Sequence, residues 1–197
     1  GSECSTVQNP AAIFEHSFSI GASNDLGEIA GFSSRGPVLV DGSNRMKPNI
    51  SAPGVNVRSC LPNNNFANYS GTSMAGPHVA GVVALMIAAN PNLAGQVERI
   101  ETILERTASP RSEIGNCGVY DNETIPNNVY GYGIVNAYEA VKAAQADAYN
   151  SPENNAFVFP NPSDGNFTFL FKNSDENTSS DIRIWDASGR LIFELNN

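Results

Sequence analysis

The chain has 197 residues, of which 41% are hydrophobic, enough for one large domain or for one domain and a smaller module. It carries 11 Lys and Arg against 20 Asp and Glu, a net charge of −9, which argues against nucleic acid and anionic membrane surfaces as partners. The longest apolar run, residues 79–89, is too short to span a bilayer, so we expect no membrane span.

Residues 1–146 have the pattern of an α/β domain. Short runs rich in apolar and small residues, bounded by turn-forming residues, predict strands over 17–23 and 29–34. Residues 47–62 read as two strands separated by the turn Pro53-Gly54, and 65–71 as a further short strand.

Three helices follow these strands. Residues 73–89 are apolar on almost every side, which predicts a helix buried in the core and ended by Asn90-Pro91. A second, surface helix is predicted by apolar residues at helical spacing, with charged residues between them: Val97, Ile100, Ile103, Leu104 and Ala108. A third follows the turn at 130–133, with Asn136 as its candidate N-cap.

The composition changes after residue 146. Residues 147–156 are polar and contain a proline, so we predict a linker. Residues 157–197 alternate in the manner of strands around two turn signals, Asp164-Gly165 and Ser188-Gly189. This region predicts a small all-β module, and because the chain stops within an apolar run we expect it to be a piece of a longer protein.

The stretch Gly71 to Gly76 (GTSMAG) places Ser73 where a glycine-containing turn meets the start of a helix. Unpaired N–H groups and the helix dipole favour an anion there, so Ser73 is a candidate nucleophile. Gly71 would let a substrate backbone approach closely. An α/β-hydrolase elbow requires glycine at the position of Ala75, which disfavours that family.

Neither histidine is a credible base for Ser73. His78 follows Ser73 by five residues, which turn a helix through about 500°. His78 therefore lies about 140° around the helix from Ser73 and about 7.5 Å along the helix axis from it. That is too far for proton transfer, so we predict a buried structural histidine bonded to backbone or to a neighbouring polar group. His16 lies at the entry to a predicted strand and is expected at the surface.

The three cysteines, Cys4, Cys60 and Cys117, lack metal-ligand spacing, so zinc is not expected. In an exported protein one pair would bridge and one thiol would stay free, and the residues alone do not choose the pair.

Four segments occur in order along the chain: IAGFSSRGP (29–37), KPNISAPGVNV (47–57), SGTSMAGPHVAG (70–81) and YGYGIVNAYEAV (130–141). Together they carry a resemblance to the subtilisin-like serine proteases, the subtilase family. It covers residues 1–146 and implies the C-terminal part of a three-layer α/β fold with a parallel sheet. It also implies Ser73 as nucleophile, with Ser70 and Gly71 beside the substrate.

The family's catalytic Asp, His and oxyanion Asn motifs do not occur in this chain, and the resemblance puts them upstream of Gly1. We therefore expect the parent protein to be a secreted or cell-surface endopeptidase acting on proteins or peptides, and residues 1–197 alone to be inactive. The alternatives are a non-catalytic remnant and a binding or adhesion protein. We expect a monomer without a cofactor, and the resemblance allows structural calcium in the full-length protein.

Within the family the chain resembles the bacillopeptidase F-like branch, which implies a Cys4–Cys117 bridge and a free Cys60. Residues 157–197 resemble the type A sorting domains of type IX secretion, in FPNPSDGNFTF (159–169) and IRIWDASGRLI (182–192). That resemblance implies a partial immunoglobulin-like β-sandwich and the type IX secretion machinery as partner. An accessory adhesive β-sandwich is the alternative.

Overall fold

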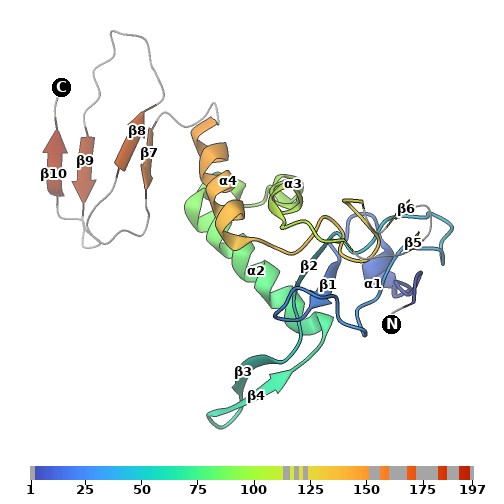
Figure 1. The fold of residues 1–197 in the computed structure, drawn as a ribbon. Coiled ribbons are helices and arrows are strands. Elements are labelled where there is room, and N and C mark those ends of the chain that lie inside the picture. The colour runs from blue at the N-terminus through green and yellow to red at the C-terminus, as the bar shows by residue number, and fades with distance from the viewer. Residues whose placement is uncertain are drawn as a thin grey trace. The chain divides into compact units, whose positions relative to one another are not determined.

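The computed structural model describes residues 3–112, 116–117, 120–121 and 124–150, together with four strands beyond them (Figure 1). The chain divides into two compact units, Gly1–Asp147 and Ala148–Asn197, which are described separately.

A parallel pair of strands forms the centre of the first unit. β1 (Ile20–Ser23) pairs with β2 (Ile50–Pro53), with Ile20 opposite Ile50. An isolated parallel bridge from Ser51 to Ile134 adds a third chain segment on the far side of β2. Ala22, Ile50 and Ala52 are fully buried, as expected for strands covered on both faces. The predicted α/β fold with a parallel sheet is confirmed.

Residues 29–34 do not form the predicted strand. Only Ile29 pairs, through an isolated antiparallel bridge to Ser23. The chain then turns, because Ser33 N donates to Ala30 O (2.9 Å) and the Ser33 hydroxyl accepts the Ala22 N–H (3.0 Å). A serine side chain thus occupies the edge of β1 where a backbone ladder was expected.

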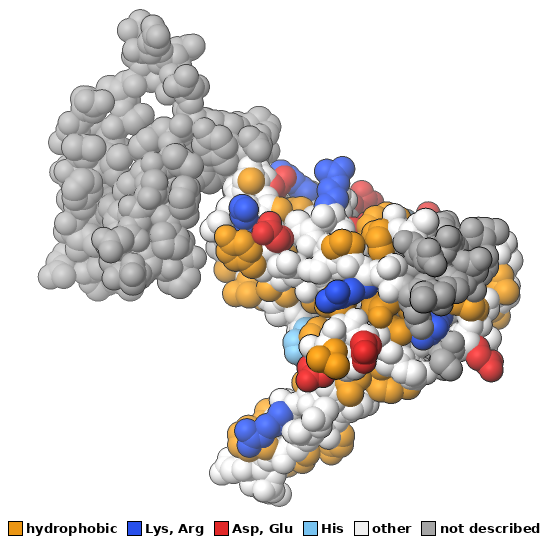
Figure 2. All heavy atoms as spheres, viewed as in Figure 1, with side chains coloured by type: hydrophobic (Ala, Val, Ile, Leu, Met, Phe, Trp, Pro, Cys, Tyr) orange, Lys and Arg blue, Asp and Glu red, His pale blue; other side chains and the backbone are white. Residues whose placement is uncertain are grey.

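The strands predicted around Pro53-Gly54 and after it are confirmed. β3 (Val57–Leu61) and β4 (Asn65–Tyr69) form an antiparallel hairpin that extends away from the helices (Figure 1). The space-filling view shows hydrophobic side chains at the surface of this hairpin (Figure 2). Phe66 is among them, with the Arg58 guanidinium 4.7 Å from its ring centre.

The central helix α2 (Thr72–Ala89) contacts both β1 and β2 and buries one face, formed by Ala75, Val79, Val82 and Met86. The expectation of a helix buried all round is wrong for this structure, because Leu85 on the other face is 55% exposed. By length and composition alone α2 could cross a membrane, but the core helix of a globular protein can have the same length and composition. Its packing on the sheet favours a core helix, and the absence of a membrane span stays a prediction.

Two further helices pack near α2. The short 3-10 helix η1 (Pro91–Leu93) leads to α3 (Val97–Thr107), which buries Ile100 and Leu104, whereas Val97 is 62% exposed and lies outside the buried face. α4 (Ala137–Asn150) begins at Asn136, whose side-chain oxygen accepts the Glu139 N–H (3.1 Å), as the predicted N-cap requires. α4 continues through four residues of the predicted linker.

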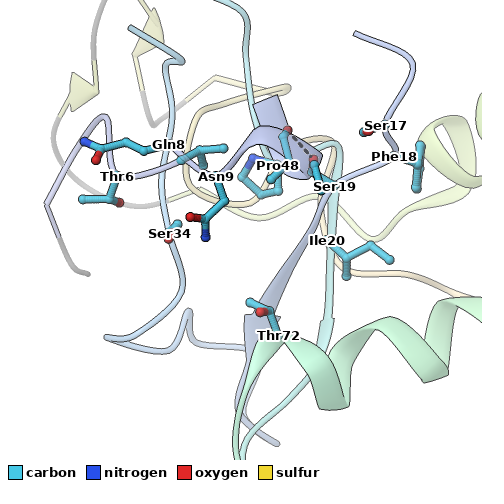
Figure 3. A pocket seen from close by; sticks show the side chains of 13 residues that line it. Thr6, Gln8, Asn9, Ser17, Phe18, Ser19, Ile20, Ser34, Pro48 and Thr72 are labelled. Atoms are coloured by element: carbon cyan, nitrogen blue, oxygen red, sulfur yellow. Dashed lines mark hydrogen bonds between the residues drawn. The ribbon is translucent and has the colours of Figure 1, made fainter. Parts of the chain in front are cut away.

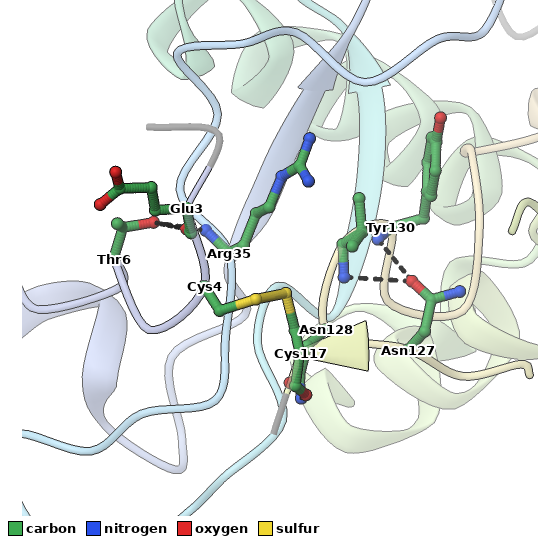
Figure 4. The surroundings of a disulfide bond; sticks show 9 residues. Glu3, Cys4, Thr6, Arg35, Cys117, Asn127, Asn128 and Tyr130 are labelled. Atoms are coloured by element: carbon green, nitrogen blue, oxygen red, sulfur yellow. Dashed lines mark hydrogen bonds between the residues drawn. A yellow bond between two sulfur atoms is a disulfide. The ribbon is translucent and has the colours of Figure 1, made fainter. Parts of the chain in front are cut away.

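The N-terminal segment carries the short helix α1 (Pro10–Ile13), and a disulfide joins Cys4 to Cys117, with 5.2 Å between their Cα atoms (Figure 4). Cys117 lies in β5 (Asn116–Cys117), which pairs with β6 (Tyr120–Asp121). Cys60 is free and exposed. The pairing implied by the family resemblance is confirmed.

The second unit contains two antiparallel pairs. β7 (Ala156–Phe159) pairs with β8 (Thr168–Phe171), and β9 (Ile182–Trp185) pairs with β10 (Leu191–Leu195). The turn signals Asp164-Gly165 and Ser188-Gly189 lie outside the described residues. Because the described strands form two separate pairs, the immunoglobulin-like sandwich stays a prediction.

Candidate active site

Ser73 is the second residue of α2, and two glycines place it there. Gly71 N donates to Gly54 O (2.8 Å), which ties the start of α2 to the end of β2. A Cβ on Gly54 would lie 2.7 Å from Ala22 Cβ and 2.8 Å from Gly71 O, so only glycine permits this approach. The Ser73 side chain is exposed.

The first turn of α2 leaves donors available beside that hydroxyl. Met74 N and Ala75 N donate to Gly71 O, at 3.0 and 3.3 Å. The N–H groups of Thr72 and Ser73 have no backbone acceptor among the described residues. Unpaired N–H groups at a helix start, together with the helix dipole, stabilise negative charge.

Ser73 lines a cavity of about 240 Å³, here called the Ser73 hollow. It lies between the hairpin and α2 and is lined by Val57, Ser59, Ser73, Met74, Pro77 and His78. Val57 and Ser59 alternate along β3, so they share one face of the hairpin. That alternation is the sequence signal from which these two lining residues could have been found.

The expectation that His78 is buried is wrong, because its side chain is exposed in the Ser73 hollow. It lies on the exposed outer face of α2, where Val57 and Ser59 of β3 line the same hollow. Its expected backbone bond is present: Nδ1 donates to Met74 O (2.9 Å). Among the described residues no hydrogen bond joins His78 to Ser73, as the helical spacing predicts. His16 is exposed, as expected.

Ser70 and Gly71 lie immediately before α2. The Ser70 hydroxyl accepts the Asn56 N–H (2.8 Å), which holds the end of β4 beside the start of β3. Gly71 occupies the N-cap position of α2. Both residues border Ser73 in the chain, and their contact with substrate stays a prediction.

A second cavity, of about 450 Å³, opens on another side of the α2 start and is here called the Thr72 hollow (Figure 3). Thr72 lines it together with residues from 6–12, 17–20, Ser34 and Pro48, and no lining side chain is charged. The sequence carries no local signal for this hollow, because its walls come from segments far apart in the chain.

A buried cation supports the wall of the Thr72 hollow. Lys47 is only 2% exposed, and its ammonium donates to Ser17 O and to Asn49 Oδ1 (2.9 Å). Burial lowers the pKa of the Lys47 ammonium and Arg45 lowers it further, whereas three carboxylates raise it, those of Glu101, Glu105 and Glu15. Among the described residues no three His, Cys, Asp or Glu side chains gather as a metal site would require.

The sequence matches the subtilase family, peptidase S8, over residues 1–133. The chain belongs to the subtilase family. It is 42% identical over 139 residues to bacillopeptidase F of Bacillus subtilis, a match that covers 70% of this chain and 9% of that protein. It is 35% identical over 178 residues to the minor extracellular protease Vpr of the same organism, covering 87% of this chain and 19% of Vpr.

Among solved structures, the CspB protease of Clostridium perfringens superimposes with a TM-score of 0.54 at 32% identity. That match covers 66% of this subtilase chain and 27% of CspB. The chain thus spans less than a third of each of these relatives.

Residues 157–197 of this subtilase match a secretion system C-terminal sorting domain. This match confirms the resemblance stated for the terminal module. A sorting domain for secretion, together with extracellular relatives, makes this a secreted or cell-surface protein.

Proposed function

We propose that this chain is the C-terminal part of a secreted subtilisin-like serine endopeptidase in which Ser73 is the nucleophile. The observation that supports this most directly is the exposed Ser73 hydroxyl at the start of α2, beside N–H groups that have no backbone acceptor. In the reaction Ser73 Oγ attacks a peptide carbonyl and forms an acyl-enzyme. The Ser73 N–H stabilises the oxyanion together with an asparagine supplied from upstream.

The proton of Ser73 must go to a base, and among the described residues no hydrogen bond links a base to the Ser73 hydroxyl. His78 is the nearest histidine in the chain, and its Nδ1 bonds to Met74 O rather than to Ser73. We propose that the catalytic His and Asp precede Gly1, which accords with a chain that spans 9% of bacillopeptidase F and 19% of Vpr. The exposed outer face of α2 is then the face that the upstream part covers.

Substrate is proposed to run past Ser70 and Gly71, with side chains entering the two hollows that flank the start of α2. Because no charged side chain lines the Thr72 hollow, an uncharged substrate side chain is favoured there.

The proposed organisation is a peptidase region over 1–146, a linker over 147–156 and a sorting region over 157–197 that the type IX secretion machinery recognises. The protease is proposed to act as a monomer.

A fluorophosphonate probe tests the proposed nucleophile. The full-length protein should be labelled on Ser73, and Ser73→Ala should abolish labelling and lower kcat about 10⁶-fold. Ser43→Ala, at an exposed serine in a loop outside both hollows, is the matched control and should label normally. Labelling that persists in Ser73→Ala would contradict the proposal, as would equal labelling of residues 1–197 and the full-length protein.

A further inference from the structure

We infer that the Cys4–Cys117 disulfide is a redox-sensitive clamp that holds one wall of the Thr72 hollow, so that its reduction weakens substrate binding next to Ser73. The inference rests on the proposed protease function and adds that the redox state of the bridge regulates substrate binding at that site.

The wall consists of residues 6–9, which begin two residues after Cys4. Thr6, Val7, Gln8 and Asn9 all line the Thr72 hollow, and Thr72 lines it from the start of α2 (Figure 3). The described residues before Pro10 form no helix or strand, so no regular backbone ladder fixes this wall. Its position therefore depends on individual contacts.

Those contacts join the wall to residues 35–36 and to α1, where Asn9 O accepts the N–H groups of Ala12 (2.9 Å) and Ile13 (3.1 Å). Ser5 N donates to Gly36 O (2.9 Å), and Thr6 N donates to Arg35 O (2.8 Å). In return Arg35 N donates to the Thr6 hydroxyl (2.9 Å). The wall is thus attached at residues 35–36 and at α1, and the disulfide adds a covalent attachment on its N-terminal side.

The disulfide closes a ring that passes through the buried interior. Gly36 N donates to Asn128 O (2.9 Å), and the Asn128 side chain donates to Cys117 O (2.7 Å) (Figure 4). Asn128 is fully buried and Cys117 is 1% exposed, so this side of the ring is anchored in the packed interior. A Cβ on Gly36 would lie 2.4 Å from Asn128 Oδ1, so Gly36 has no room to shift toward this anchor.

The other end of the bridge lies at the surface, because Cys4 is an exposed residue. Dithiothreitol supplies two electrons and two protons: one of its thiolates attacks a bridge sulfur, the S–S bond breaks, and two cysteine thiols and cyclic oxidised dithiothreitol result. The wall then loses its covalent attachment and keeps its hydrogen bonds to Arg35, Gly36 and α1. When the wall is less ordered, binding a substrate side chain requires a larger loss of conformational entropy, which weakens substrate binding. We therefore expect reduction to raise KM.

The test uses the full-length protein carrying Cys60→Ser, which removes the free exposed thiol of β3 without touching the bridge. A peptide substrate and a small fluorophosphonate, which needs Ser73 but does not fill the Thr72 hollow, are compared before and after dithiothreitol. Reduction should raise KM about tenfold while kcat and the fluorophosphonate rate change less than about twofold. The double variant Cys4→Ser, Cys117→Ser should reproduce the reduced values and no longer respond to dithiothreitol.

An unchanged KM after reduction would overturn the inference. A parallel fall of peptide turnover and probe labelling would also overturn it, because that result indicates a purely structural bridge. An oxidised protein that neither cleaves peptide nor reacts with the probe would instead refute the proposed function.

Hydrogen exchange provides a readout that does not depend on the double variant folding. The amides of Ser5, Thr6 and Val7 should exchange faster after reduction, while those of α2 stay unchanged. Equal exchange of the three amides in both redox states would contradict the clamp.

Discussion

At the scale of single residues, Lys47 shows how a charge can be buried in a small core. Its ammonium reaches Ser17 O and Asn49 Oδ1, and Asn49 in turn donates to Glu105 (3.1 Å). A buried ammonium loses its hydration and is tolerated only with such partners. Nothing local in the sequence distinguishes Lys47 from an exposed lysine, and its burial arises from segments 17–19, 49 and 105 meeting around it.

Replacing Lys47 with methionine should lower the free energy of unfolding by about 1–3 kcal/mol, because Ser17 O loses its donor inside the protein. Lys142→Met is the matched control, since Lys142 is 64% exposed and its ion pair with Glu139 is 3.8 Å long. The control should change stability by less than about 1 kcal/mol. Urea denaturation measures both, and equal losses would contradict the role assigned to Lys47.

The same pair of proteins tests the effect of pH. Burial lowers the pKa of Lys47 in the folded protein, so the unfolded chain binds more protons between the lowered and the ordinary lysine pKa. Stability contributed by this group therefore rises with pH across that alkaline window. The rise should be present in the native protein and absent from Lys47→Met, and identical pH profiles would contradict it.

At the scale of elements, the local sequence pattern was sufficient to predict a helix or strand where a single face or a single turn determines it. β3 was predicted from the turn Pro53-Gly54 and β4 as a further short strand, whereas α3 was predicted from helical spacing and the Asn136 cap from capping chemistry. Residues 29–34 were wrongly predicted as a strand, because the Ser33 hydroxyl takes the Ala22 N–H that a neighbouring backbone would have used. Side-chain competition of that kind leaves no trace in an apolar pattern.

Substitutions at Met86 and Leu85, which are adjacent on α2, test whether only one face of this helix is packed. Met86 is fully buried and Leu85 is 55% exposed. In the 197-residue chain Met86→Ala should lower the free energy of unfolding by about 2–5 kcal/mol, because it leaves a cavity in the hydrophobic core. Leu85→Ala should cost less than about 1 kcal/mol. Thermal or urea unfolding compares the two, and similar costs would show that both faces of α2 are packed.

At the scale of the whole molecule, the two compact units correspond to two separable tasks under the proposed function. Deleting residues 157–197 should retain the protein inside the cell, because the sorting match lies there. Ser73 should keep its reactivity toward fluorophosphonate, since every residue lining either hollow precedes the second unit. Cell fractionation with probe labelling measures both, and export of the truncated protein would contradict the division.

The sequence by itself determined the family, the start of α2 at the candidate serine and most helices and strands, because these depend on local spacing and on motifs of contiguous residues. Only the tertiary structure decided which face of α2 is buried, and why His78 is exposed rather than packed. It also decided that Thr6 to Asn9 and Thr72 share one hollow. The physical reason is the same in each case: burial and cavities arise between residues distant in the chain, and no local pattern encodes which distant surfaces meet.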